Sequence, residues 1–374
     1  MIPRRVAVLG GWAPSLIKFR GPLLAAMVAR GHHVHAMAAD AEPATIEELA
    51  RMGVSFTELA LERTGADPLR DARLFAALVR QFRTLRLDTV LAYTVKPVVY
   101  GGLAARVAGV PQRAAMLTGL GYAFGEPTGW KHRAVGQVAR GLLRLSLAGC
   151  QTVLLQNPDD HRELVRRGLL TSDHQVVVTR GSGVDLEHYA PTPLPAGPLR
   201  FLFIGRLLTE KGIREYVEMA RQLRRSHPQA RFGVVGWIDP NPTSVRAQEL
   251  EQWVQQGVIE YAGALADVRP ELARAHVLVL PSYREGTPRS VLEAMSMGRA
   301  VITTDAPGCR ETVVHDDSGL LVPVRSSDAL IAAGRRLLEE PGLLPRLAAA
   351  GQLRARSLYD ARAVAAQVLS ALAL

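Results

Sequence analysis

Two glutamates, Glu285 and Glu293, lie on either side of a predicted junction between a strand and a helix. Glu285 follows the apolar run Val277–Leu280, and Glu293 lies inside the amphipathic segment 290–297. The first free N–H groups of such a helix bind anions, above all phosphate. Each carboxylate can also accept two hydrogen bonds from a vicinal diol. A lone pair of glutamates is more often surface charge, but this sequence context predicts a site for a phosphorylated sugar.

The turn before this helix supplies three further candidates, Gly286, Thr287 and Pro288. We expect Thr287 to cap the helix and Pro288 to occupy its first position. The backbone N–H groups of the turn would then point toward a ligand.

A second group of candidates follows the apolar run Phe201–Ile204. Gly205 and Arg206 come directly after this run, and Lys211 and Gly212 open the next predicted helix. Two cations at the carboxyl edge of a sheet can neutralise a diphosphate and stabilise the charge of a departing nucleoside diphosphate. By themselves these residues would more often be surface charge beside a helix start.

A glycine pair, Gly10 and Gly11, follows the first predicted strand. Glycine lets a ligand approach the backbone closely. The pair does not form a G-x-G-x-x-G motif, so a tight turn between strand and helix is the alternative interpretation.

These residues can lie close together only if parallel strands end at one edge of a sheet. The sequence pattern predicts such strands. Short apolar runs alternate with amphipathic segments of helical period, which is typical of a doubly wound α/β sheet. The apolar runs are Val6–Leu9, Val34–Met37, Val54–Leu59, Thr89–Ala92, Ala114–Leu117, Val153–Leu155, Val176–Thr179, Phe201–Ile204, Phe232–Val235 and Val277–Leu280. The helical segments include 21–30, 72–87, 213–225, 290–297 and 361–372.

The pattern is interrupted once, by a segment with four prolines that begins after Ser182, and it then restarts. A chain of 374 residues has room for two cores of ordinary size. We therefore predict two Rossmann-like domains, 1–182 and 199–356, joined by a hinge at 183–198. The last helix, 357–374, could cross back to the first domain. Two such domains would face a cleft, since ligands bind beyond the carboxyl ends of the strands.

The net charge of +10 is unevenly distributed along the chain. There are 23 basic and 14 acidic residues up to Ser182, and 22 and 21 after it. A basic domain can bind nucleic acid, an anionic membrane or an anionic substrate.

Several classes of protein are excluded by composition. No apolar run approaches the roughly 18–20 residues of a spanning helix, and the first residues do not resemble a signal peptide. The two cysteines, Cys150 and Cys309, form no disulfide framework or Cys-x-x-Cys pair. A cytoplasmic protein is the expectation that remains.

Together, the Glu285-x7-Glu293 pattern, the Gly205–Gly212 segment and the early glycine loop resemble the retaining glycosyltransferases of family 4, which have the GT-B fold. Four further segments resemble the bacterial subgroup that builds capsule, O-antigen and lipid-linked oligosaccharides. This subgroup includes N-acetylgalactosaminyltransferases that act on undecaprenyl-diphosphate-linked bacillosamine. The segments are Thr94–Gly101, Leu117–Phe124, Gly181–Asp185 and Pro281–Gly286.

The resemblance implies a role for each candidate. The catalytic group would be Glu285, which contacts the donor sugar, with Arg206 and Lys211, which hold the diphosphate. Glu293 would bind the ribose hydroxyls of the donor. The remaining donor-binding residues would be Gly286, Thr287, Pro288, Gly205, Gly11 and Thr118.

The resemblance also implies a UDP-sugar donor, most often a UDP-N-acetylhexosamine, and transfer with retention, without a metal or another cofactor. The leaving phosphate would help to deprotonate the acceptor, and the sequence agrees in having no Asp-x-Asp pair. Many members of the family have a histidine near the reacting sugar, where this chain has Thr118. A threonine can hydrogen-bond the donor sugar but cannot serve as an imidazole base.

The implied acceptor is a polyprenyl-diphosphate-linked sugar, bound by the N-terminal domain at the inner face of the plasma membrane. Basic amphipathic helices can lie on an anionic membrane, although a solvated helix face has the same pattern. The candidates for acceptor or membrane contact are Lys96, Arg80, Arg83, Trp130, Lys131 and Arg133.

Three alternatives remain open. A glycosyltransferase with a soluble acceptor would show the same donor site. A UDP-sugar 2-epimerase shares the fold, but the arrangement of Glu285 and Glu293 argues against it. A nucleic-acid-binding protein would suit the sequence pI of about 10.1, but the chain has no recognition-helix or aromatic-platform motif.

Overall fold

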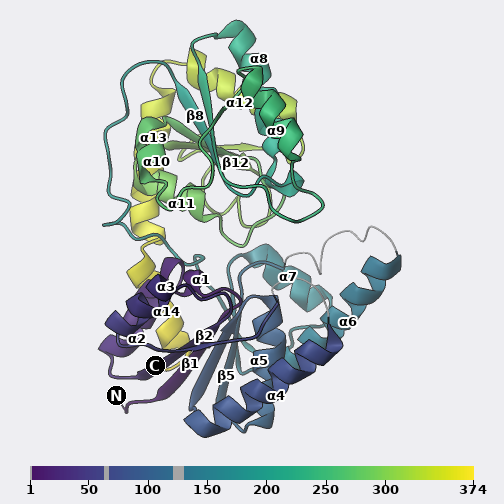
Figure 1. The fold of residues 1–374 in the computed structure, drawn as a ribbon. Helices are drawn as coiled ribbons and strands as arrows, with labels where there is room; N and C mark the ends of the chain where they lie inside the picture. Colours follow the sequence, from purple (N-terminus) through teal and green to yellow (C-terminus); the bar gives the residue numbers. More distant parts are fainter. Residues whose placement is uncertain (1, 63–66, 121–129) are drawn as a thin grey trace. The chain divides into compact units, whose positions relative to one another are not determined.

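The computed structural model describes residues 2–62, 67–120 and 130–374, without the side chains of 130–135. The chain forms two compact units (Figure 1). The first unit comprises residues 1–182 together with 361–374, and the second comprises 183–360. Each unit is built on one parallel sheet.

The sheet of the first unit has seven strands in the order β3-β2-β1-β4-β5-β6-β7. The strands are β1 (Arg5–Leu9), β2 (His33–Ala38), β3 (Ser55–Glu58), β4 (Thr89–Tyr93), β5 (Gln112–Leu117), β6 (Thr152–Leu155) and β7 (Gln175–Val178). The helices are α1 (Pro14–Lys18), α2 (Gly21–Ala29), α3 (Pro43–Arg51), α4 (Pro68–Leu85), α5 (Val95–Val107), α6 (Trp130–Leu147), α7 (Pro158–Arg166) and α14 (Ala361–Ala371).

Two apolar layers cover this sheet, because successive side chains of a strand point to opposite faces. Leu9 of β1 packs with α4, α5 and α6, whereas Val8 packs with α1, α2, α3 and α14. In α14, Val368 and Leu369 are buried in the second of these clusters. The last helix of the chain is therefore part of the first unit, beside α2.

The sheet of the second unit has six strands in the order β10-β9-β8-β11-β12-β13. The strands are β8 (Arg200–Ile204), β9 (Arg231–Val235), β10 (Glu260–Tyr261), β11 (Val277–Leu280), β12 (Ala300–Thr304) and β13 (Leu320–Val322). The helices are the 3-10 turn η2 (Thr209–Lys211), α8 (Ile213–Ser226), α9 (Ala247–Gln255), α10 (Arg269–Arg274), α11 (Arg289–Ser296), α12 (Ser327–Glu339) and α13 (Leu343–Leu358). The prediction of two parallel, Rossmann-like α/β domains is confirmed.

The proline-rich segment 183–198, which we predicted as a hinge, belongs to the second unit. Buried side chains bind several of its carbonyl groups, and backbone hydrogen bonds hold it as well. The fully buried Arg299 donates to the carbonyl oxygen of Pro193 at 3.0 Å. His276 Nε2 lies 3.0 Å from the carbonyl oxygen of Pro195, and the N–H of Val184 donates to the carbonyl of Tyr359 at 2.7 Å.

A search of the described helices for one that is both long enough and apolar enough to cross a bilayer finds none.

Candidate active site

The second sheet has a topological switch point between β8 and β11. From β8 the sheet continues to β9 and β10, and from β11 it continues to β12 and β13 in the opposite direction. All these strands are parallel, so their carboxyl ends meet at one edge. Ligands of doubly wound sheets bind at such a point. The loops with Arg206, Lys211 and Glu285 leave the sheet there.

Lys211 and Glu285 form an ion pair at this edge, between Nζ and Oε1. Ser282 Oγ donates a second hydrogen bond to the same carboxylate oxygen, at 2.7 Å. The two charged side chains are only 18% and 13% exposed, so solvent screens them little. The pair offers an ammonium group to a phosphate oxygen and a carboxylate to a sugar hydroxyl.

The segments that carry this pair are in direct contact. The N–H of Tyr283 donates to the carbonyl of Glu210 at 2.9 Å. Gly212 has φ +72°, and a Cβ there would lie 2.2 Å from the carbonyl oxygen of Pro281. Glycine is thus required at 212 both by backbone conformation and by the neighbouring loop.

The Glu285 loop rests on a turn that our sequence analysis missed. The N–H of Glu285 donates to the carbonyl of Pro307 at 2.9 Å. Gly308 has φ +81°, and a Cβ there would lie 2.3 Å from the carbonyl oxygen of Glu285 and 2.4 Å from that of Gly286. The Pro-Gly pair at 307 and 308 is a turn signal, but sequence alone does not reveal what the turn contacts.

Helix α11 begins one residue later than we predicted. Pro288 is its N-cap residue, with extended backbone at φ −72° and ψ 110°, and it makes no side-chain capping hydrogen bond. The prediction that Thr287 occupies the N-cap position is therefore wrong. Because Pro288 adopts extended rather than helical backbone, Arg289 becomes the first helical residue.

Glu293 lies on α11, with its side chain 11% exposed, and has partners of its own. Nη2 of Arg289, one turn earlier on the helix, lies 3.0 Å from Glu293 Oε1. The hydroxyl of Tyr189 lies near enough to Glu293 to be affected by its charge. Burial, followed by the charge of Glu293, raises the pKa of the Tyr189 hydroxyl. The pair of Arg289 and Glu293 has (i, i+4) spacing and can be recognised in the sequence. The proximity of Tyr189, which is about a hundred residues away in the sequence, cannot.

Arg206, by contrast, is 43% exposed and pairs with Asp239, whose carboxylate lies 3.2 Å from the guanidinium. Asp239 follows β9, the strand next to β8, and we did not predict it. The N–H of Gly205 donates to the carbonyl of Val235 at 3.0 Å, and a Cβ at Gly236 would lie 1.9 Å from the carbonyl oxygen of Gly205. The structure therefore joins Lys211 to Glu285, and gives Arg206 a different acidic partner.

The first sheet has its own switch point, between β1 and β4. Gly11 follows β1 there, and a Cβ at Gly11 would lie 3.4 Å from Thr94 Oγ1. At Gly10 a Cβ would lie only 2.2 Å from the Tyr93 hydroxyl, so close packing requires glycine at 10. Thr94 has φ +66°, a strained conformation for a β-branched residue that often marks a functional edge.

The other candidates of the first unit lie on different elements. Thr118 follows β5 and is half-buried. Lys96 Nζ lies 2.9 Å from Asp71 Oδ1, and the Tyr100 hydroxyl donates to Asp71 Oδ2 at 2.7 Å. This cluster joins α4 to α5.

Arg80 and Arg83 are exposed on α4. The predicted residues Trp130, Lys131 and Arg133 lie in the first turns of α6, and their side chains are outside the described part of the structure.

Within the described residues, no group of three or more His, Cys, Asp and Glu side chains is arranged to hold a metal ion. Both cysteines are buried and free. Burial, and then the nearby charge of Glu285, raise the pKa of the Cys309 thiol to about 12.

Residues 198–340 match the family model of the group 1 glycosyl transferases, and residues 18–157 match the glycosyl transferase 4-like model. The chain thus combines a glycosyl transferase 4-like domain with a glycosyl transferase group 1 domain. The resemblance inferred from its residues is thereby confirmed.

Two relatives of this glycosyltransferase are named for lipid-linked acceptors. The N,N'-diacetylbacillosaminyl-diphospho-undecaprenol alpha-1,3-N-acetylgalactosaminyltransferase of Campylobacter jejuni is 27% identical over 92% of each chain. The UDP-Gal:alpha-D-GlcNAc-diphosphoundecaprenol alpha-1,3-galactosyltransferase of Escherichia coli is 26% identical over 73% of this chain and 72% of its own.

Solved structures agree on the fold. The sucrose-phosphate synthase of Thermosynechococcus elongatus superposes with a TM-score of 0.81 over 98% of each chain, at 20% identity. Anabaena HepE in complex with UDP gives a TM-score of 0.77 over 99% of each chain, at 18% identity. The glycosyltransferase thus has the GT-B fold.

Proposed function

We propose that this glycosyltransferase moves a hexose or an N-acetylhexosamine from a UDP-sugar to a sugar linked to a polyprenyl diphosphate. The observation that carries the proposal is the match along 92% of both chains with a transferase named for a diphospho-undecaprenol acceptor. The E. coli relative is named for the same class of acceptor and for a UDP-galactose donor.

Transfer with retention is part of the proposal. The names of both relatives give an alpha-1,3 linkage in the product. The sugar of UDP-galactose is itself α-linked to the diphosphate, so an α product keeps the configuration of the donor. In this reaction the acceptor oxygen bonds to C1, the bond from C1 to the diphosphate oxygen breaks, and the acceptor proton passes to the leaving UDP.

The geometry of the second unit suits such a leaving group. Lys211 is only 18% exposed and already faces a carboxylate oxygen. We propose that a diphosphate oxygen takes the place of this carboxylate on Nζ, and that Glu285 then accepts hydrogen bonds from the donor sugar. Positive charge fixed at the leaving diphosphate stabilises the transition state more than the ground state. Arg206 adds a second, more exposed cation, and Glu293 binds the ribose, with no metal required.

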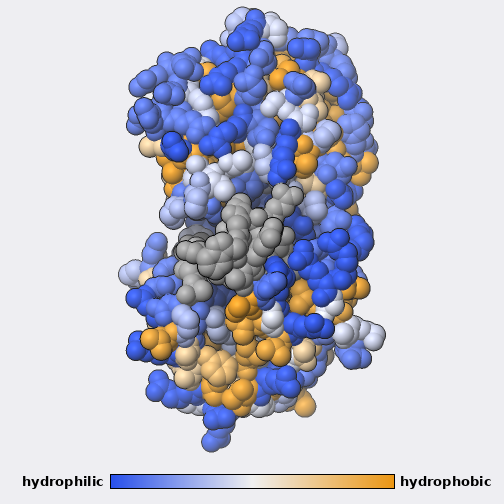
Figure 2. Space-filling view, turned by 90° about the vertical axis from the view of Figure 1, so that its right-hand side faces the viewer, coloured by the Kyte–Doolittle hydropathy of each residue, from blue (hydrophilic) through white to orange (hydrophobic). Residues whose placement is uncertain are grey.

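A lipid-linked acceptor requires a membrane-facing surface, and α6 supports one. Its residues at 138, 141 and 145 are exposed and follow helical spacing, with Val138 63% and Leu145 57% exposed. The exposed Arg144 lies beside them. Figure 2, which shows the side with α4 and α6, has hydrophobic side chains exposed among hydrophilic ones on the first unit. We propose peripheral binding to an anionic membrane through this face.

The test is UDP release across a panel of UDP-sugars, with and without a detergent-solubilised polyprenyl-diphosphate-sugar. We expect release that needs one donor and the lipid together. Release with a soluble sugar in place of the lipid would overturn the acceptor class. Formation of an isomerised UDP-sugar without an acceptor would instead identify an epimerase.

A further inference from the structure

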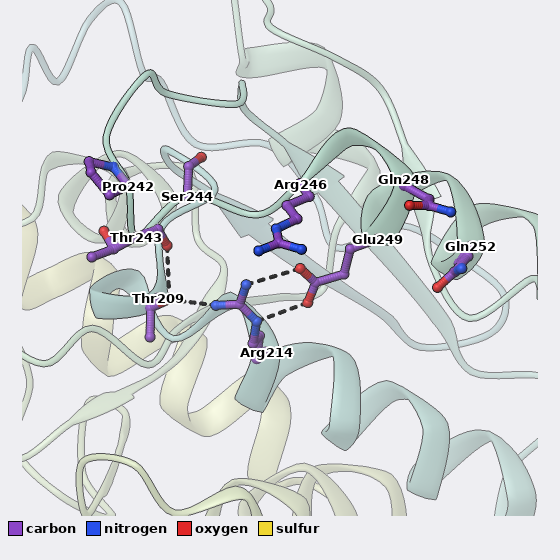
Figure 3. A pocket seen from close by; sticks show the side chains of 9 residues that line it. All are labelled: Thr209, Arg214, Pro242, Thr243, Ser244, Arg246, Gln248, Glu249 and Gln252. Atoms are coloured by element: carbon purple, nitrogen blue, oxygen red, sulfur yellow. Dashed lines mark hydrogen bonds and ion pairs between the residues drawn. The ribbon is translucent and has the colours of Figure 1, made fainter.

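A polar pocket of about 500 Å³ lies in the second unit, between η2, the start of α8 and the start of α9 (Figure 3). Its lining, which is entirely in the described part of the chain, includes none of Arg206, Lys211, Glu285 and Glu293. The residues that line the pocket are therefore different from those assigned to the donor. It is lined by Thr209, Arg214, Pro242, Thr243, Ser244, Arg246, Gln248, Glu249 and Gln252.

The single carboxylate of this lining is already neutralised. Arg214 binds Glu249 with two parallel bonds, from Nε at 2.8 Å and from Nη2 at 3.0 Å. The third nitrogen, Nη1, donates to Thr209 Oγ1. The hydrogen bonds that Arg214 donates to Glu249 raise the pKa of Arg214. Arg214 and Glu249 thus form a hydrogen-bonded ion pair on one side of the pocket, and their charges cancel (Figure 3).

The lining has a second guanidinium, that of Arg246, which is not part of the Arg214–Glu249 ion pair. Arg246 is exposed and is the N-cap residue of α9. No carboxylate in residues 2–62, 67–120 or 136–374 lies within ion-pair distance of it, and Figure 3 shows it directed over the Arg214–Glu249 pair. The lining consequently carries one net positive charge, which favours an anionic ligand.

The wall beside Arg246 is made of amide groups. Gln248 and Gln252 lie one turn apart on α9, and their amides make no hydrogen bond to the described residues. Side-chain amides both donate and accept, which suits the hydroxyl groups of a sugar. On the opposite wall, Ser244 Oγ is occupied, because it donates to the carbonyl of Leu207 at 3.1 Å.

We propose that this pocket binds a sugar that carries an anionic oxygen group, either a phosphate or a carboxylate. The anionic group pairs with Arg246, and the hydroxyl groups contact Gln248 and Gln252. A phosphorylated monosaccharide and an acidic sugar of a glycan share this chemistry. This site is additional to the donor and acceptor sites of the proposed transfer.

The test is calorimetric titration of the full-length protein with glucose 6-phosphate, glucuronate and neutral glucose, in saturating UDP. UDP occupies Lys211 and Arg206, so that these cations do not compete for the probe. We expect saturable binding of at least one anion, and none of glucose. Tighter binding of glucose 6-phosphate supports a phosphorylated ligand, and tighter binding of glucuronate supports an acidic glycan.

The variant R246Q should weaken binding of the anion roughly tenfold or more. The matched control is R335Q, which removes another exposed arginine, on α12 of the same unit, and should leave binding unchanged. E249Q should not weaken binding, because it removes the only carboxylate of the lining. The proposal is overturned if neither anion binds, or if R246Q and R335Q lower the affinity equally. Either failure leaves the UDP-release test of the transfer reaction intact.

Discussion

At the scale of single residues, the Lys211–Glu285 pair is the feature that the chemistry depends on most. A lysine in contact with water would lose conformational entropy and solvation free energy when it binds a diphosphate. This lysine is already oriented by Glu285. The carboxylate is held in turn by Ser282. Both groups are thus positioned before the donor arrives.

Replacement of Lys211 by methionine should lower kcat roughly 10²–10³-fold, because it removes fixed positive charge at the leaving diphosphate. The measurement is UDP release with the best donor, with near-UV circular dichroism to show that the fold is retained. R221Q, on α8, where the arginine side chain is 38% exposed, is the control with the same loss of charge and should keep full activity. A kcat of K211M within threefold of the parent protein would rule out this role.

At the scale of elements, the turn at Gly308 fixes the Glu285 loop. The variant G308A should lower UDP affinity roughly tenfold, because its Cβ would displace the backbone of Glu285 and Gly286. Gly342 offers a matched control, since its φ of +80° is the same and a Cβ there would meet nothing within 4 Å. G342A should cost only about 1 kcal/mol of stability through its backbone.

Thermal unfolding and UDP titration of both variants separate these effects. We expect both variants to lose a similar amount of stability through backbone strain. Only G308A should also lose UDP affinity. Equal UDP affinity for G308A and G342A would show that the turn does not position the loop.

A second element-scale prediction concerns the segment 183–198 and its anchor, His276. Its Nδ1 accepts the N–H of Arg200 at 3.1 Å, so its Nε2 carries the proton and donates to Pro195. Burial, partly offset by that bond, lowers the pKa of His276 below 6.5. Below pH 6.5 the unfolded chain therefore binds a proton that the folded chain does not, and stability is lost as the pH falls.

The unfolding temperature should accordingly drop between pH 7.5 and pH 5.5, and H276Q should show a smaller drop. Histidines 32 and 35 also have lowered pKa values, so the variant removes only part of the dependence. An identical drop in H276Q and the parent protein would contradict the assignment.

The elements were predictable where a local pattern specifies them. Every predicted apolar run overlaps a strand, because buried parallel strands are continuously apolar. The sequence analysis missed three strands: the five-residue β12, although it is fully buried, and the two-residue β10 and three-residue β13, which are too short to leave such a pattern. In the site, Lys211 and Glu285 were recognisable from the sequence around them. Ser282, Asp239, Tyr189 and Gly308 were not, since their roles depend on loops that only the folded sheet brings together.

At the scale of the whole molecule, the excess positive charge of the first 182 residues has a physical consequence. Basic residues near an anionic membrane contribute about 1 kcal/mol each, and salt screens this attraction. Exposed apolar side chains add a contribution that salt does not screen. A surface that combines the two should bind anionic vesicles more tightly than zwitterionic ones, and should keep some binding at high salt.

Leu145 on α6 tests this surface directly, because it is 57% exposed, and Leu353 on α13 of the other unit is a control at 66%. L145D removes an apolar contact and adds a negative charge, so it should weaken binding to anionic vesicles roughly tenfold or more. L353D makes the same chemical change far from α6 in sequence and should bind like the parent protein. Co-sedimentation with vesicles at low and high salt measures both. Equal losses in the two variants would mean that total charge, and not the α6 face, governs membrane binding.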